Sequence, residues 1–109
     1  MVLIFGGAYQ GKLAYAMEHF GADEADILKL DKWILELIGA DMNVEEAVQN
    51  FIEGNPEAIV VCNDISCGVV PVDPLMRKWR EAVGRALAKI SQNSSEVIRM
   101  FCGIPTRIK

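Results

Sequence analysis

The chain begins with a short apolar run that leads directly into a glycine-rich segment. Residues 2–5 read Val-Leu-Ile-Phe, and residues 6–13 read Gly-Gly-Ala-Tyr-Gln-Gly-Lys-Leu. A buried strand, a glycine turn and a helix that starts near Lys12 are the context in which the motif G-x-x-x-x-G-K-[ST] binds phosphate. The glycines let successive backbone N–H groups point inward, and the helix N-terminus adds positive potential. This segment predicts an α/β fold with a phosphate-binding loop.

Eight residues of this segment are the candidate nucleotide-binding residues: Gly6, Gly7, Ala8, Tyr9, Gln10, Gly11, Lys12 and Leu13. Lys12 would reach the outer phosphates. The last position of the motif normally carries a Ser or Thr hydroxyl that ligates Mg²⁺, and Leu13 stands there instead. The usual Mg²⁺ ligand is therefore missing: Mg²⁺ stays a possible cofactor, but this motif assigns no residue to it. The alternative is that the glycines only shape a turn between a strand and a helix.

Charge is unevenly spread over the 109 residues, whose net charge is −4. Residues 1–73 hold three basic and thirteen acidic side chains, whereas residues 74–109 hold eight basic and two acidic ones. An acidic chain disfavours non-specific binding to nucleic acid. The basic C-terminal third would face an anionic ligand or an acidic patch on a sister subunit, or it would simply form a solvated helix face.

The composition favours a single globular domain over residues 1–109. Apolar residues make up 51% of the chain, and no apolar run approaches the ~20 residues of a membrane span. The N-terminus lacks the basic region of a signal peptide. Cys62, Cys67 and Cys102 are odd in number and contain no C-x-x-C pair, so we expect reduced thiols in a cytoplasmic protein.

Hydrophobic patterns and capping residues predict alternating strands and helices. Strands are expected at residues 2–5, 25–30, 58–62 and 96–101, with residues 103–105 closing the last one. Helices are expected at residues 12–20, from Asp31 to Gly39, from Asn43 to Gly54, and from Asp73 to the turn at residues 93–95. This alternation predicts a three-layer α/β fold with a mostly parallel sheet of about four strands.

Several segments together resemble one enzyme family. They are the loop 6–12, the stretch Asn-Asp-Ile-Ser-Cys-Gly-Val-Val-Pro at 63–71, the helix residues Arg77, Arg80, Gly84 and Arg85, and Cys-Gly-Ile-Pro at 102–105. They resemble the bifunctional adenosylcobinamide kinase / adenosylcobinamide-phosphate guanylyltransferases of cobalamin biosynthesis. That resemblance implies a P-loop NTPase-like domain, often assembled as a propeller-like trimer. Family members phosphorylate adenosylcobinamide and then transfer GMP through a guanylylated histidine.

The resemblance also assigns roles to particular residues. It implies GTP or ATP as ligand, adenosylcobinamide as a corrinoid substrate, and a homo-oligomer such as a trimer. Lys12 would neutralise the transferred phosphate, and Asp64 or Asp31 would serve the metal or the acceptor hydroxyl. The alternative for Asp31 is a helix N-cap. Asn63 is a further candidate site residue. Arg77, Arg80 and Arg85 would contact phosphate or acidic residues of a neighbouring protomer, and the alternative for them is a solvated helix face.

The departures from the family pattern set limits on the expected activity. The chain is shorter than family members, and the missing segment is where they carry a strand, a helix and the nucleophilic histidine. His19 is the only histidine, and it does not match that position. Phosphoryl transfer is therefore favoured over guanylyl transfer. Two alternatives stay open: a non-catalytic relative that acts as a structural or regulatory partner, and a nucleotide-binding protein of an unrelated pathway.

Overall fold

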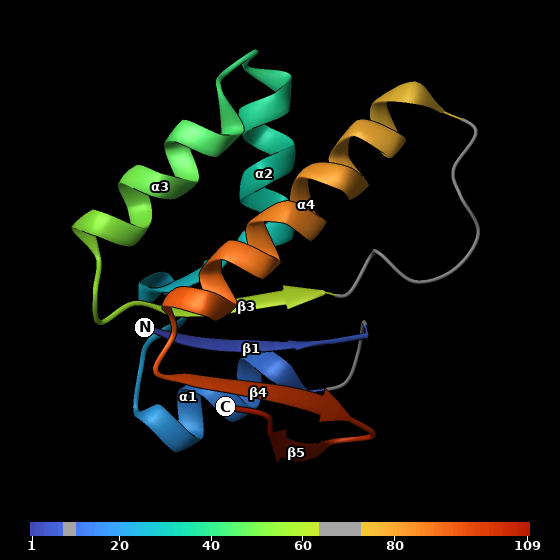
Figure 1. The fold of residues 1–109 in the computed structure, drawn as a ribbon. Coiled ribbons are helices and arrows are strands. Elements are labelled where there is room, and N and C mark those ends of the chain that lie inside the picture. The colour runs from blue at the N-terminus through green and yellow to red at the C-terminus, as the bar shows by residue number, and fades with distance from the viewer. Residues whose placement is uncertain (8–10, 64–72) are drawn as a thin grey trace.

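The computed structural model describes residues 1–7, 11–63 and 73–109 of the chain (Figure 1). Five strands form one sheet in the order β2-β3-β1-β4-β5. The strands are β1 (Val2–Gly6), β2 (Ile27–Lys29), β3 (Ile59–Asn63), β4 (Glu96–Phe101) and β5 (Ile104–Arg107). The helices are α1 (Lys12–Phe20), the 3₁₀ turn η1 (Glu24–Asp26), α2 (Leu30–Gly39), α3 (Val44–Gly54) and α4 (Pro74–Asn93).

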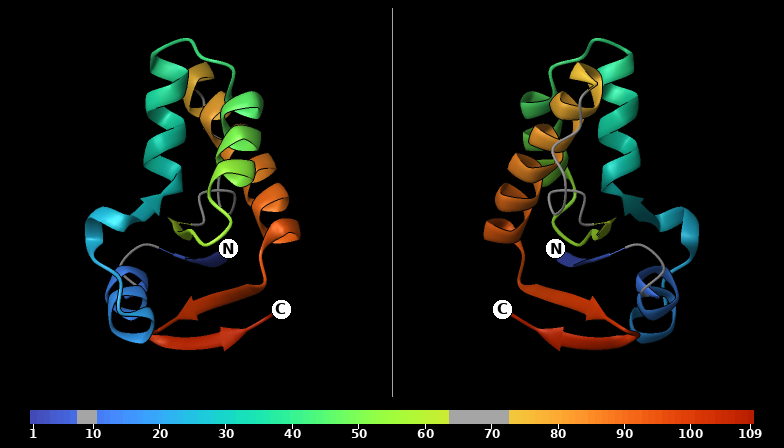
Figure 2. Two further views of the ribbon diagram at one scale, coloured as in Figure 1. Left: turned by 90° about the vertical axis from the view of Figure 1, so that its left-hand side faces the viewer. Right: turned by 90° about the vertical axis from the view of Figure 1, so that its right-hand side faces the viewer.

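The sheet is covered by helices on both faces, so the predicted three-layer arrangement is confirmed. Helices α2, α3 and α4 lie on one face, and α1 lies on the other (Figures 1 and 2). The two faces form separate apolar clusters because side chains alternate along a strand. Leu3 and Val60 belong to the cluster under α2 and α4, whereas Ile4 and Val61 belong to the cluster over α1.

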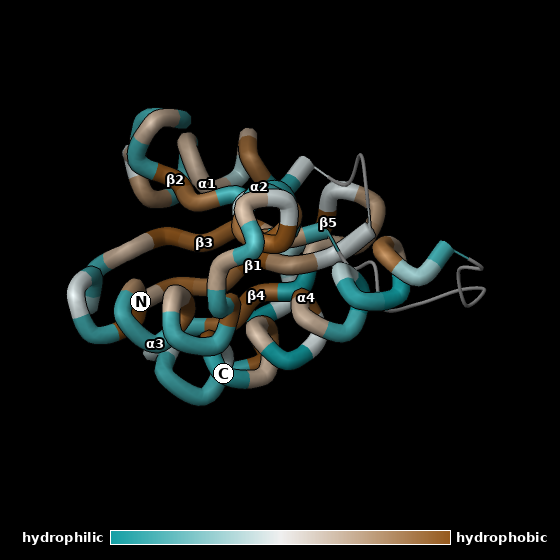
Figure 3. Tube along the Cα trace, turned by 90° about the horizontal axis from the view of Figure 1, so that it is seen from above, coloured by the Kyte–Doolittle hydropathy of each residue, from teal (hydrophilic) through white to brown (hydrophobic). Residues whose placement is uncertain are grey.

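Strand β1 occupies the centre of the sheet and pairs in parallel with β3 and with β4. A strand between two neighbours and two helical layers must be apolar along its length, and the hydrophobic colouring of β1 and β3 follows this rule (Figure 3). In register, Gly6 lies opposite Asn63 on β3 and Met100 on β4. The glycine-rich segment therefore starts at the middle of the sheet, at the carboxyl ends of its strands.

Both helix caps expected from the sequence are present. The Asn43 side chain accepts a hydrogen bond from the backbone N–H of Glu46 over 3.1 Å. The Asp73 side chain accepts one from the N–H of Leu75 over 2.8 Å, and Pro74 takes the first helical position. These contacts satisfy backbone donors that the first helical turn leaves without partners.

The expected number of about four strands is corrected to five within the described residues. Strand β5 runs antiparallel to β4, with Ile104 opposite Phe101 and Pro105 opposite Met100. All four β5 residues are exposed, so no alternation of apolar and polar residues marks them as a strand. A proline is tolerated there because β5 is an edge strand.

The second strand is also shorter than expected. Residues 24–26 form the turn η1, and only Ile27–Lys29 pair with β3. Helix α2 begins at Leu30, whose side chain is fully buried in the cluster under α2 and α4. Burial of Leu30 against that helical layer ends the strand early.

Gly6 lies opposite Met100 of β4, and its Cα faces the Met100 backbone at close range. A Cβ atom at this position would lie inside the van der Waals radius of the Met100 carbonyl oxygen, and the φ angle of Gly6 is +158°. Because the obstacle is strand backbone, it cannot turn aside as a flexible side chain can.

We predict that Gly6→Ala lowers the free energy of unfolding by at least about 2 kcal/mol, in the range of overpacked cores. Gly84→Ala is the matched control, because a Cβ at Gly84 meets nothing within 4 Å. In the interior of α4, alanine should stabilise the protein by roughly 0.5–1 kcal/mol. Urea unfolding of both variants measures the difference, and equal effects would contradict the close approach of β1 and β4.

Candidate functional site

A hollow of about 260 Å³ lies at the carboxyl ends of β2 and β3, beside the start of α1. It is lined by residues 11–14 at the start of α1, by Lys29, Asp31 and Lys32 around the start of α2, and by residues 61–63 of β3. Ligands of open α/β sheets collect at this end of the strands. The sequence segment that predicts phosphate binding therefore borders a cavity in the place where such a ligand is expected.

Lys12 is the central side chain of the hollow. It is only 7% exposed, and its Nζ donates a hydrogen bond to the Gly7 carbonyl oxygen over 2.6 Å. Burial lowers the pKa of Lys12 below its ordinary value of 10.5, and the charges of Asp31 and Cys62 offset part of that shift. The surroundings of Lys12 thus disfavour its charged form on balance.

The first turn of α1 meets the hollow without a side-chain cap. Gly11 is the N-cap residue, with φ at +81°, and it makes no side-chain capping hydrogen bond. A left-handed conformation at this point suits glycine. The N-cap residue itself therefore offers no side-chain acceptor to the backbone N–H groups of the first turn.

Asp31 is held in place from two directions. Its side chain is 6% exposed, and its Oδ2 accepts a hydrogen bond from Asn63 Nδ2 over 3.2 Å. Its backbone carbonyl accepts a bond from Trp79 Nε1 over 2.8 Å, which connects α4 to the start of α2. The alternative role as a helix N-cap is wrong, because Lys29 is the N-cap residue and Asp31 lies inside α2.

The described part of the hollow does not form the usual Mg²⁺ site of the motif. Leu13 is half-buried and packs against the apolar cluster over α1, so no hydroxyl stands at its position. Asp31 is the single carboxylate among the described lining residues. No group of three or more His, Cys, Asp or Glu side chains that could hold a metal occurs in the described ranges.

Two lysines of the hollow were not among the residues predicted from the sequence. Lys29 ends β2, and its Nζ lies 2.6 Å from Glu24 Oε1. Lys32 is exposed in the first turn of α2 and also lines the hollow. Their positions in the sequence could have indicated them, because Lys29 ends the second strand and Lys32 directly follows the candidate Asp31.

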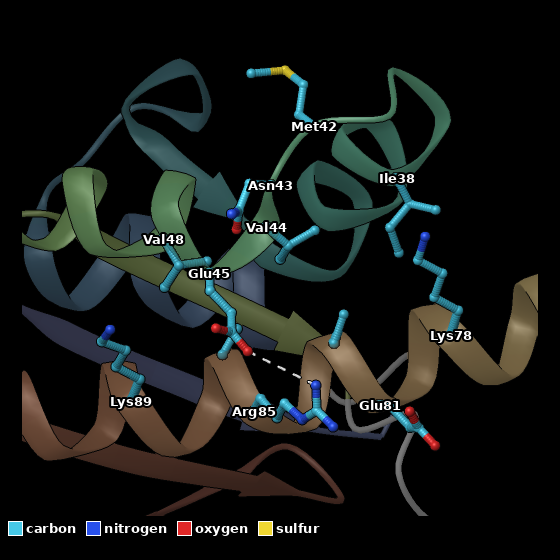
Figure 4. A pocket seen from close by; sticks show the side chains of 12 residues that line it. Ile38, Met42, Asn43, Val44, Glu45, Val48, Lys78, Glu81, Arg85 and Lys89 are labelled. Carbon is cyan, nitrogen blue, oxygen red and sulfur yellow. Dashed lines mark ion pairs between the residues drawn. The ribbon is translucent and has the colours of Figure 1, made fainter.

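The predicted arginines lie along α4, and none lines the described part of the hollow. Arg77 is exposed and Arg80 is half-buried. Arg85 faces α3, where its Nη1 lies 3.8 Å from Glu45 Oε1. Figure 4 shows this ion pair across a second groove, of about 360 Å³, between α3 and α4. The described lining of that groove contains no Ser, Cys or His nucleophile.

His19 lies in the last turn of α1, seven residues beyond Lys12 and about 10 Å along the helix axis from it. It is exposed and stacks on Tyr15, with 5.0 Å between the ring centroids. Ala8, Tyr9, Gln10, Asp64 and Cys67 lie outside the described residues, and their roles remain predictions. In the described ranges, the Cys62 thiol is buried and the Cys102 thiol is exposed.

Comparison with known proteins assigns the chain to a family. No described helix is long and apolar enough to cross a membrane. None of the curated proteins compared matches the chain. A family model described as cobinamide kinase / cobinamide phosphate guanyltransferase matches residues 27–108, from β2 to just past β5. The chain therefore belongs to the cobinamide kinase / cobinamide phosphate guanyltransferase family of cobalamin biosynthesis.

Proposed function

We propose that this family member binds the triphosphate of GTP or ATP at residues 6–13 and in the hollow beside them. The observation that carries the proposal is the buried Lys12 ammonium at the carboxyl ends of β1 and β3. The family match begins at Ile27, so the phosphate-binding role rests on the sequence motif and on this geometry.

The energetics of Lys12 support a functional role. Its lowered pKa means that the fold tolerates the charged ammonium at a cost. Groups held in such environments cluster at functional sites, where a ligand supplies the missing counter-charge. A phosphate oxygen could replace the Gly7 carbonyl as acceptor and would stabilise the ammonium more strongly, because the hydrogen bond would then join two charges.

Each residue of the proposed site would have its own role in phosphoryl transfer. The backbone of Gly6, Gly7 and Gly11 would allow close approach of the phosphates, and Lys12 would neutralise the transferred group. Asp31, oriented by Asn63, would accept the proton of the attacking hydroxyl, and Asp64 would assist. The acceptor, by family, is a corrinoid alcohol. We further propose a homo-oligomer such as a trimer.

Two observations favour a non-catalytic relative as the second candidate. Leu13 removes the hydroxyl ligand of the metal, and His19 lies at the far end of α1, away from the hollow. Guanylyl transfer through His19 is therefore disfavoured. A cobinamide kinase assay separates the candidates: a phosphorylated product that Asp31→Asn abolishes supports catalysis, and no product with a bound nucleotide supports a binding or regulatory role.

Calorimetric titration of GTP and ATP tests the proposed site. Lys12→Ala should weaken binding at least about tenfold, since a hydrogen bond between charged groups is lost. Lys89→Ala is the control, because it removes a lysine from the α3–α4 groove instead. Equal affinities of wild type and Lys12→Ala, or no binding by wild type, would contradict the proposal.

Lys12 should also make stability depend on pH in a defined direction. Its folded-state pKa lies below the unfolded value, so the cost of the buried charge is present in full below the folded pKa. That cost falls as the pH rises through the folded value towards 10.5. Lys12→Met keeps the volume and removes the charge.

We predict that Lys12→Met is at least as stable as wild type at pH 7, and that wild type gains relative to it between pH 7 and 10.5. Urea unfolding at several pH values measures the difference. A Lys12→Met protein that is more than about 1 kcal/mol less stable at every pH would show that the ammonium serves the fold, not a ligand.

A further inference from the structure

We propose that Lys29 and Lys32 bind the triphosphate together with Lys12 and supply the positive charge that Mg²⁺ provides in other sites of this motif. This inference rests on the proposed function and goes beyond it. It names two further binding residues and the metal-free nucleotide as the ligand.

The distribution of charge along the chain is the first argument. Residues 1–73 contain thirteen acidic residues and only three basic ones, which are Lys12, Lys29 and Lys32. All three line the same hollow. A segment that is otherwise acidic thus gathers all its cations around one cavity, where the opposing carboxylate among the described residues is Asp31.

The positions of the lysines around the hollow are the second argument. Lys29 is the last residue of β2 and lies opposite Val61 of β3, which also lines the hollow. Lys32 follows three residues later, in the first turn of α2. Lys12 is the first residue of α1, so the three cations come from three separate elements that border the same cavity.

A surface carboxylate pairs with one of these cations. Glu24 Oε1 lies 2.6 Å from Lys29 Nζ, and hydrogen bonding to Lys29 lowers the pKa of Glu24. Both side chains are substantially exposed, so breaking this ion pair costs little free energy. A phosphate group could take the place of the Glu24 carboxylate on Lys29.

The chemistry of position 13 is the third argument. The motif's Ser or Thr hydroxyl is a ligand for Mg²⁺, and Leu13 packs against the apolar cluster over α1 instead. A triphosphate without its metal carries more negative charge, which ammonium groups can neutralise as point charges. The loss of the metal ligand and the gathering of lysines are thus explained together.

Calorimetric titration with GTP and with inorganic tripolyphosphate, in EDTA and in Mg²⁺, tests the inference. Wild type should bind both ligands in EDTA within about threefold of the affinity in Mg²⁺. Lys29→Ala and Lys32→Ala should each weaken binding in EDTA about fivefold, as expected for exposed charge pairs. Lys89→Ala, on α4, should leave the affinity unchanged, and circular dichroism verifies the fold of each variant.

The possible outcomes distinguish failure of this inference from failure of the proposed nucleotide-binding function. Binding that depends on Lys12 but weakens more than tenfold in EDTA would overturn the inference alone. Binding that Lys29→Ala and Lys32→Ala leave unchanged would also overturn it alone. Absence of any binding that depends on Lys12 would overturn the proposed function as well.

Discussion

The burial of the Lys12 side chain at the end of a parallel sheet is the constraint on which the candidate site depends. Gly11 adopts a left-handed conformation immediately before Lys12, the first residue of α1, and both residues line the hollow at the end of β3. The Gly7 carbonyl accepts the hydrogen bond of Lys12, yet burial still lowers the pKa of Lys12. We propose that this environment serves an anionic ligand, because groups with strongly perturbed pKa values cluster at functional sites.

The sheet and the helical layer hold Asp31 beside the same hollow as Lys12. Asp31 stands at the start of α2, where the adjacent Leu30 is fixed in the core. The Asn63 amide and the Trp79 indole then hold its side chain and its backbone, respectively. The Trp79 contact spans 48 positions in the sequence. It joins α4 directly to the backbone of Asp31, so the position of α4 affects the geometry of the hollow.

The sequence predicts best what local chemistry decides. Apolar runs mark β1 and β3, and Asn43 and Asp73 mark two helix starts. The phosphate-binding role of the glycines and Lys12 stays a prediction. The sequence predicts poorly what only tertiary contact decides. Strand β5 is exposed along its length and shows no alternation of apolar and polar residues. The sequence allows Asp31 to be a helix N-cap, whereas α2 begins earlier because Leu30 is buried in the core. Lys29 and Lys32 can be assigned to the hollow only once β2 is known to pair with β3. The pairing of Arg85 with Glu45 likewise depends on how α3 packs against α4.

The central claim is that a triphosphate binds at the hollow beside Lys12, and not in the groove between α3 and α4. Backbone amide NMR of the ¹⁵N-labelled protein, titrated with GTP in EDTA, tests it most directly. The account predicts that the largest shifts fall on Gly7, Gly11, Lys12, Lys32 and Asn63. Shifts confined to the groove residues around Val44, Val48 and Arg85, or no shifts at saturating GTP, would contradict it.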